Sequence, residues 1–168
     1  FKKLKLFRNL EIKPLDMNYY LNDQTHKMET FTYEWRPLGF MTKSGDFIEF
    51  NIIHIFDKPE EDFELVDNVY LPAGEYWNNR YETQIRSYRG RRLSSSAEIS
   101  FGEFYTGKRT ALQLDLNLNL NKHLNVSIDW EKNFINIPQK NFTTDEIGGR
   151  IDYSFNPKLA TSLFAQWN

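Results

Sequence analysis

The side chains that could carry out chemistry lie far apart in this sequence. None of the three histidines, His26, His54 and His123, has a second metal ligand at the spacing of a metal site, and no H-E-x-x-H sequence occurs. The absence of cysteine excludes a thiol nucleophile, a cysteine-ligated zinc and a disulfide scaffold. No G-x-S-x-G sequence marks a serine nucleophile. The sequence therefore predicts no catalytic residue, no metal site and no cofactor.

Two charged groups offer weaker alternatives. Arg86, Arg89, Arg91 and Arg92 could contact phosphate, for example in a lipid head group, or could form a solvated hairpin turn. The acidic run 60–62 could bind calcium, but it lacks the glycine and the ligand spacing of an EF-hand loop and is more simply a solvated loop. Carboxylates from separate strands could also pair for glycoside hydrolysis, at a distance that a sequence does not give. An enzyme is therefore kept only as a third hypothesis.

Composition bounds the class of protein. The chain has 168 residues, which fits one domain. Its 21 Lys and Arg against 23 Asp and Glu give a net charge of -2, so nucleic acid is not an expected partner. The mean hydropathy of -0.64 and the lack of an apolar run of about 20 residues exclude a transmembrane helix. Strands of a membrane barrel alternate between apolar and polar residues, so a low mean hydropathy is compatible with them.

The elements that must position these side chains are strands. Between Arg109 and Asn121, leucine occupies every second position from Leu112 to Leu120, with polar residues between. A helix would spread these leucines around its circumference, whereas a strand puts them on one face. The alternation resumes in 124–130 after a short turn, which predicts a hairpin. Similar patterns predict strands over 4–12, 31–36, 47–56, 75–88, 97–105, 150–155 and 159–167.

The predicted fold is an all-β, antiparallel up-and-down meander of about nine strands that forms part of an outer-membrane β-barrel. Several predicted strands exceed the mean soluble strand of about 5–6 residues and reach the ~9–11 residues of a membrane-spanning strand. Residues 1–168 are expected to be a single barrel segment truncated at both ends, since the chain starts without Met and stops within a strand pattern. Bacterial barrels usually have even strand numbers, so an odd number indicates that the segment does not close alone.

The predicted connections differ between the two ends of the meander. One end receives short turns and one longer loop, at 89–92, 121–123, 156–158 and 38–46. The other receives long loops and one short turn, at 16–27, 57–72, 138–145 and 106–108. Short turns on one side and long loops on the other are typical of outer-membrane barrels, whose short turns face the periplasm.

The alternation does not say which face is inside. In a soluble sheet the apolar face is the core and the charged face is solvated. In a membrane barrel the apolar face contacts lipid and the polar face lines the interior. Charges of both signs recur on the polar face of successive strands, where neighbours could pair, and this favours the membrane arrangement. So do aromatic residues near strand ends, as in interfacial girdles: Trp35, Tyr105, Trp130, Phe155 and Trp167.

The membrane arrangement assigns a side to each residue of the alternating strands. The predicted lumen-facing residues are Arg80, Glu82, Arg86, Glu98, Gln113, Asp115, Asn117, Asn119, Asp129, Arg150 and Asp152. The predicted lipid-facing residues are Leu112, Leu114, Leu116, Leu118, Leu120, Val126, Ile128, Trp130, Ile151, Tyr153 and Phe155.

Three motifs, in this order, resemble a known family. Residues 71–76 resemble an I-P-x-G-x-Y signature, and 101–109 resemble G-x-F-Y-x-G-x-R. Residues 150–157 and 163–168 resemble an R-x-x-Y-S-F-S-P…F-x-Q-Y-N ending, with Asn156 and Trp167 replacing the usual Ser and Tyr. The family comprises Bacteroidota proteins with an N-terminal family-9-type carbohydrate-binding module and a C-terminal β-barrel domain of uncharacterised function. This chain shows neither that module nor the closing strands expected after the final motif.

Three functional hypotheses follow. The first is an outer-membrane barrel segment of a cell-envelope protein, which anchors or allows passage, has membrane lipid as its partner, and is linked to glycan through a module outside this chain. The second is a soluble antiparallel domain that binds carbohydrate or a protein partner. The third is an outer-membrane enzyme whose site lies on rim loops such as 57–72.

Overall fold

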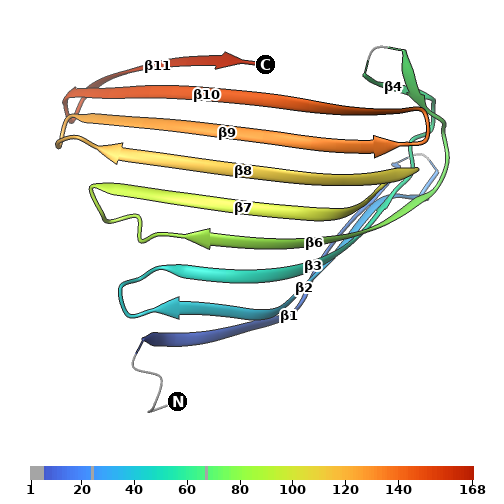
Figure 1. The fold of residues 1–168 in the computed structure, drawn as a ribbon, viewed down its shortest axis with the longest axis horizontal. Coiled ribbons are helices and arrows are strands. Elements are labelled where there is room, and N and C mark those ends of the chain that lie inside the picture. Colours follow the sequence, from blue (N-terminus) through green and yellow to red (C-terminus); the bar gives the residue numbers. More distant parts are fainter. Residues whose placement is uncertain (1–5, 24, 67) are drawn as a thin grey trace.

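The computed structural model describes residues 6–23, 25–66 and 68–168. They form an antiparallel meander in which nine strands make one sheet and two short strands make a separate hairpin (Figure 1). The all-β, antiparallel prediction is therefore confirmed. The strand order in the sheet follows the chain, and its two edges are β1 (Phe7–Leu21) and β11 (Leu159–Trp167), so the described residues do not close into a barrel. No helix long and apolar enough to cross a membrane occurs in the described part of the chain.

The main strands are 9 to 17 residues long. They are β1 (Phe7–Leu21), β2 (Met28–Thr42), β3 (Phe47–Asp57), β6 (Tyr76–Arg86), β7 (Leu93–Phe104), β8 (Gly107–Asn119), β9 (Leu124–Ile137), β10 (Lys140–Asn156) and β11 (Leu159–Trp167). The hairpin consists of β4 (Phe63–Val66) and β5 (Val69–Leu71). The predicted strand start at Leu4 lies outside the described residues.

Several segments predicted as loops are strand. β1 continues through most of 16–23, β2 runs to Thr42, and β10 begins at Lys140. In β1 the pairing with β2 shifts register between Glu11 and Lys13 and again between Lys13 and Asp16. Such bulges move the following side chains to the opposite face, so the alternation that predicts a strand is lost while the backbone pairing continues.

The connections still differ between the two ends of the sheet. One end, called here the short-turn end, carries the turns 43–46, 87–92, 120–123 and 157–158. The other, called here the loop end, carries 22–27, 58–75, 105–106 and 138–139. The predicted long loop at 57–72 is confirmed and contains the β4–β5 hairpin, whereas the predicted long loops at 16–27, 38–46 and 138–145 are wrong because strand pairing extends into them.

A cluster of buried apolar side chains lies at the loop end. Val69 from the hairpin packs against Ile135 and Ile137 near the end of β9, and all three are buried. Ile135 lies in register with Arg109, and Arg109 with Gly102. The hairpin therefore covers the loop end of the same sheet face that carries most of the charged side chains.

Candidate functional site

The sheet has one polar face and one apolar face, defined by residues that lie opposite each other in successive strands. Gln84, Glu98, Gln113 and Glu131 form one row of the polar face. The neighbouring row on the apolar face contains Ile85, Ala97, Leu114 and Trp130. Residues paired directly across antiparallel strands have side chains on the same side, so the two rows lie on opposite faces.

Burial is inverted relative to a soluble sheet. The buried polar side chains include Glu49 at 5%, Asn51 at 2% and Ser100 at 7% exposure, all on the polar face. Apolar side chains at the centre of the sheet are open, for example Ile99 at 42% and Ile128 at 45%. Scattered exposed apolar residues are normal, but a continuous exposed apolar face marks a surface that another apolar phase covers.

The eleven predicted lumen-facing residues all lie on this polar face, as their register partners show. Nine of the predicted lipid-facing residues lie on the apolar face by register. Phe155, at a register shift, contacts the ring of Tyr153 on that face at 4.7 Å, and Leu120 follows the last residue of β8. What each face contacts in the whole protein stays a prediction.

Two aromatic assignments differ from the sequence prediction. Tyr105 lies in the turn between β7 and β8 with φ 49°, and its hydroxyl donates to Asp57 at 2.7 Å. Its ring contacts those of Phe63 and Tyr76, so it holds the loop end together instead of standing on the apolar face. Burial, with the Asp57 hydrogen bond second, raises the pKa of the Tyr105 hydroxyl. Trp130 lies at mid-strand in β9 and not near a strand end.

The sequence did not predict an ionic cluster that lies on β2, β3 and β6. Glu49 forms ion pairs with Arg36 Nη2 at 2.9 Å and with Arg86 Nη2 at 3.3 Å. Arg36 Nε also donates to Asn51 Oδ1 at 2.9 Å. Segment 47–56 reads as apolar on both faces, but Glu49 and Asn51 share one face, and this spacing was the available signal. The cluster gives the buried charge of Glu49 two cationic partners, as burial of a carboxylate requires.

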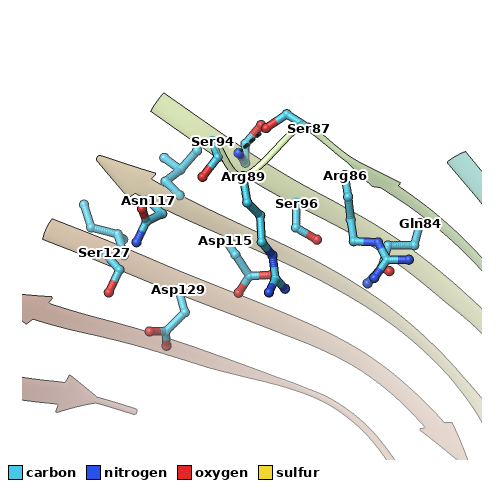
Figure 2. A pocket seen from close by; sticks show the side chains of 13 residues that line it. Gln84, Arg86, Ser87, Arg89, Ser94, Ser96, Asp115, Asn117, Ser127 and Asp129 are labelled. Atoms are coloured by element: carbon cyan, nitrogen blue, oxygen red, sulfur yellow. Dashed lines mark hydrogen bonds between the residues drawn. The ribbon is translucent and has the colours of Figure 1, made fainter. Parts of the chain in front are cut away.

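A hollow of about 590 Å³ lies on the polar face near the short-turn end (Figure 2). It brings together four of the predicted lumen-facing residues, Arg86, Asp115, Asn117 and Asp129. Asp115 and Asp129 lie directly opposite each other in β8 and β9. No hydrogen bond or ion pair reaches either carboxylate from the residues that the structure describes.

Two arginines complete this hollow. Arg89, from the turn 87–92, extends its guanidinium over the hollow toward Asp115, and Arg86 reaches in from β6 (Figure 2). The remaining wall is mostly serine and amide side chains from β7, β8 and β9. Such a surface can hydrogen-bond water or a polar solute. Among the described residues, no serine hydroxyl of this wall hydrogen-bonds to a carboxylate that would act as its base. Among the described residues, no three histidine, aspartate or glutamate side chains gather where they could hold a metal ion.

The turns at the short-turn end are tied to each other. Asp46, in the turn between β2 and β3, pairs with Arg91 at 2.6 Å and accepts the Tyr88 backbone N–H at 3.0 Å. The hydrogen bonds from Arg91, Ser44 and Tyr88, in that order, hold the pKa of the Asp46 carboxyl well below its usual range. The arginines of 86–92 thus contribute one cross-turn ion pair, through Arg91, and two hollow-lining residues, Arg86 and Arg89.

Comparison of the chain with protein-family models, with curated proteins and with solved structures finds no match.

Proposed function

We propose that this chain forms part of the wall of an outer-membrane β-barrel, with its apolar face against lipid and its polar face against a water-filled interior. The observation that supports this proposal is that polar side chains on one face of the sheet are buried while apolar side chains on the other face are exposed. Paired and amide-rich polar side chains such as Glu49 and Asn51 are buried, while Ile99, Leu116 and Ile128 are open. A soluble protein would leave the charged face to water and cover the leucines, whereas a membrane barrel requires the opposite.

The extent of the apolar band agrees with a membrane. Counted from the short-turn end, the outward positions of β8 run Leu118, Leu116, Leu114 and Leu112 before Thr110. In β9 they run from Leu124 to Trp130 before Lys132. Each run spans seven residues, which at ~3.4 Å each and tilted by ~40° cover roughly 18 Å, within the ~25 Å apolar band of known membrane barrels.

Among the described residues, one ion pair lies on the apolar face, and its position fits this depth. Lys132 in β9 pairs with Asp145 in β10 at 2.6 Å and lies 5.7 Å from the centre of the Phe134 ring. Lys132 is the ninth residue from Leu124, the start of its strand. It therefore lies near the far boundary of a band spanned by about 9–11 residues, where a charged pair costs much less than at mid-membrane.

The proposal requires additional strands beside β1 and β11. Unpaired backbone groups are not tolerated in lipid, so each edge of the sheet must pair with a further strand. With the short-turn end toward the periplasm, the β4–β5 hairpin lies at the outer opening of the barrel and covers part of it. This arrangement is suited to anchoring a cell-envelope protein or to limiting passage, and a glycan-binding module beyond this chain would sit outside the cell.

Membrane fractionation of the full-length protein tests the proposal. The protein should appear in the outer-membrane fraction and require detergent for extraction. Its gel mobility should change on boiling, because a closed barrel stays folded in the gel detergent until the sample is boiled. Recovery in buffer alone, without a mobility change, would contradict the proposal and make the apolar face a contact with another protein layer.

A further inference from the structure

A second hollow of about 290 Å³ lies on the polar face at the loop end, whereas the hollow in Figure 2 lies near the short-turn end of the same face. Strands β2, β3, β6, β7 and β8 contribute to its wall, so it is formed by main-sheet strands and not by one mobile loop. Its size is near the lower limit of small-molecule sites, which are about 300–1,000 Å³. A ligand in it would have to be small.

The amide of Asn78 lines this hollow and has no partner. The Asn78 side chain is 7% exposed, and its Oδ1 is buried without a hydrogen bond from any described residue. Buried amides in folded proteins are nearly always hydrogen-bonded, so an unpaired one requires a physical reason. A rotation of the amide about its Cβ–Cγ bond presents either the donor or the acceptor to the hollow.

Arg80, two residues further along β6, interacts with Glu98 only through the attraction of their charges and forms no hydrogen bond with any described residue. Its Nε is buried without a hydrogen bond, and no carboxylate in the described ranges forms an ion pair with it. The register explains this, because Arg80 lies opposite Ile53 on one side and Gly102 on the other, and neither has a side-chain acceptor. Gly102 is required here, since a Cβ would lie 2.1 Å from the backbone oxygen of Asn79.

Gly102 has a second arginine on its other side. Arg109 in β8 lies opposite Gly102, so two arginines flank one glycine across three adjacent strands, with backbones about 10 Å apart. Arg109 donates through Nε to Asn133 at 2.8 Å and through Nη2 to Glu131 at 3.1 Å, which leaves Nη1 without a described partner. Both arginines line the hollow.

The two acidic residues of the hollow are already engaged elsewhere. Asp57 accepts the hydroxyl of Tyr105, and Glu103 accepts the backbone N–H and the amide of Asn79. The wall itself carries two arginines and two carboxylates, and just outside it Glu131 pairs with Arg109 and Glu98 interacts with Arg80, so there is no excess of positive charge. A singly charged anion is therefore favoured over a doubly charged one, since the second negative charge would meet Asp57 and Glu103 without a further cation.

We propose that this hollow binds a small hydroxylated monocarboxylate, such as a sugar acid. Its carboxylate lies between the guanidiniums of Arg80 and Arg109, whose planar donor groups match carboxylate geometry. A rotation of the Asn78 amide turns its buried Oδ1 toward the hollow, where a hydroxyl of the same ligand donates to it. The site is built from register and contacts of this chain, so it does not depend on the membrane proposal.

Calorimetric titration of the folded full-length protein with four probes tests the proposal. Gluconate carries a carboxylate and hydroxyls, acetate only the carboxylate, glucose only hydroxyls, and inorganic phosphate a mostly doubly charged anion. Gluconate should bind at least tenfold more tightly than each of the other three. Equal binding of phosphate, or no gluconate binding at millimolar concentration, would overturn the proposal.

Three variants locate the binding. R80Q should weaken gluconate binding at least tenfold, whereas R150Q, which removes the same charge from the same face without touching this hollow, should leave it unchanged. Arg150 stacks at 5.5 Å on Phe164 and has no ion pair in the described part of the chain, so it is a matched control. N78L should abolish gluconate binding while leaving the fold at least as stable, because it removes an unpaired buried amide. Wild-type binding by R80Q, or by a folded N78L, would refute the site.

Discussion

Replacing Leu114 with arginine tests which phase covers the apolar face. Leu114 is 36% exposed and lies opposite Ala97 and Trp130. It is the sixth residue of β8 counted from Asn119, near the centre of a span of about 9–11 residues. In the proposed barrel its arginine would sit near the bilayer midplane, where such a substitution costs ~2–4 kcal/mol. This lowers the folding equilibrium constant by about 30- to 900-fold.

Two control variants make the test specific. Gln113→Arg introduces the same charge one residue away on the polar face, between Glu98 and Glu131, and should be nearly neutral. Leu118→Arg lies on the apolar face next to the short-turn end and should cost about 0–1 kcal/mol, because the penalty falls toward the membrane interface. Folding into lipid vesicles at increasing urea concentration, followed by the heat-dependent gel shift, gives the three free energies.

The pattern of the three values decides the matter. A protein partner packed on the apolar face would also reject an arginine, but its penalty would follow local packing and not the distance from the strand end. Equal penalties for Leu114→Arg and Leu118→Arg would therefore refute a lipid-covered face. A Gln113→Arg variant as damaging as Leu114→Arg would show that the two faces are not distinguished.

Three further outcomes are expected. Removing either partner of the Lys132–Asp145 pair should destabilise the protein more than removing both in K132M/D145L, because each single change leaves an unpaired charge on the apolar face. Urea unfolding of the two single variants and the double variant measures the three free energies. The depressed pKa of Asp46 means that its contacts between the turns 43–46 and 87–92 are complete above the usual aspartate pKa and are lost only as pH falls through the depressed value. The NMR signal of the Tyr88 backbone amide, which donates to Asp46, should therefore stay constant through pH 4 in the wild type. The Asp46→Asn variant should show no acid transition of this signal. The raised pKa of Tyr105 means that its hydroxyl keeps its proton above the pH at which exposed tyrosines ionise, so Tyr105→Phe should remove the last step of an ultraviolet alkaline titration, and loss of an earlier step would contradict its burial.

Strand alternation was sufficient to predict the sheet where it was regular. The pattern from Leu112 to Leu118 predicted β8 and its two faces, since period-2 repetition over several residues has no helical alternative. The same reasoning failed in β1, where bulges interrupt the alternation, and in the first part of β10, where 143–146 are all polar. Backbone pairing with β2 and β9 holds these segments, and a pattern of side chains does not record it.

The hollows were less predictable than the strands, because each depends on which residues lie opposite one another. Asp115 and Asp129 were both predicted on the polar face, but their direct juxtaposition is a property of the β8–β9 register. Arg80 was predicted there too, whereas its lack of a hydrogen-bond partner follows from Gly102 opposite it. The role of Asn78 had no signal in the sequence, since it is one of two adjacent asparagines near the start of a strand and only the structure shows that its side chain is buried.

The two ends of the polar face differ in their chemistry, and this difference bears on passage through the proposed barrel. The short-turn end presents Asp115 and Asp129 together with Arg86 and Arg89, so its hollow carries charges of both signs. The loop end presents Arg80 and Arg109 on either side of Gly102, and this gap is the feature that suits a carboxylate. The β4–β5 hairpin packs beside this second hollow, so a carboxylate that enters the proposed barrel from the loop end would be held near the opening, before it reached the mixed charges of the other hollow.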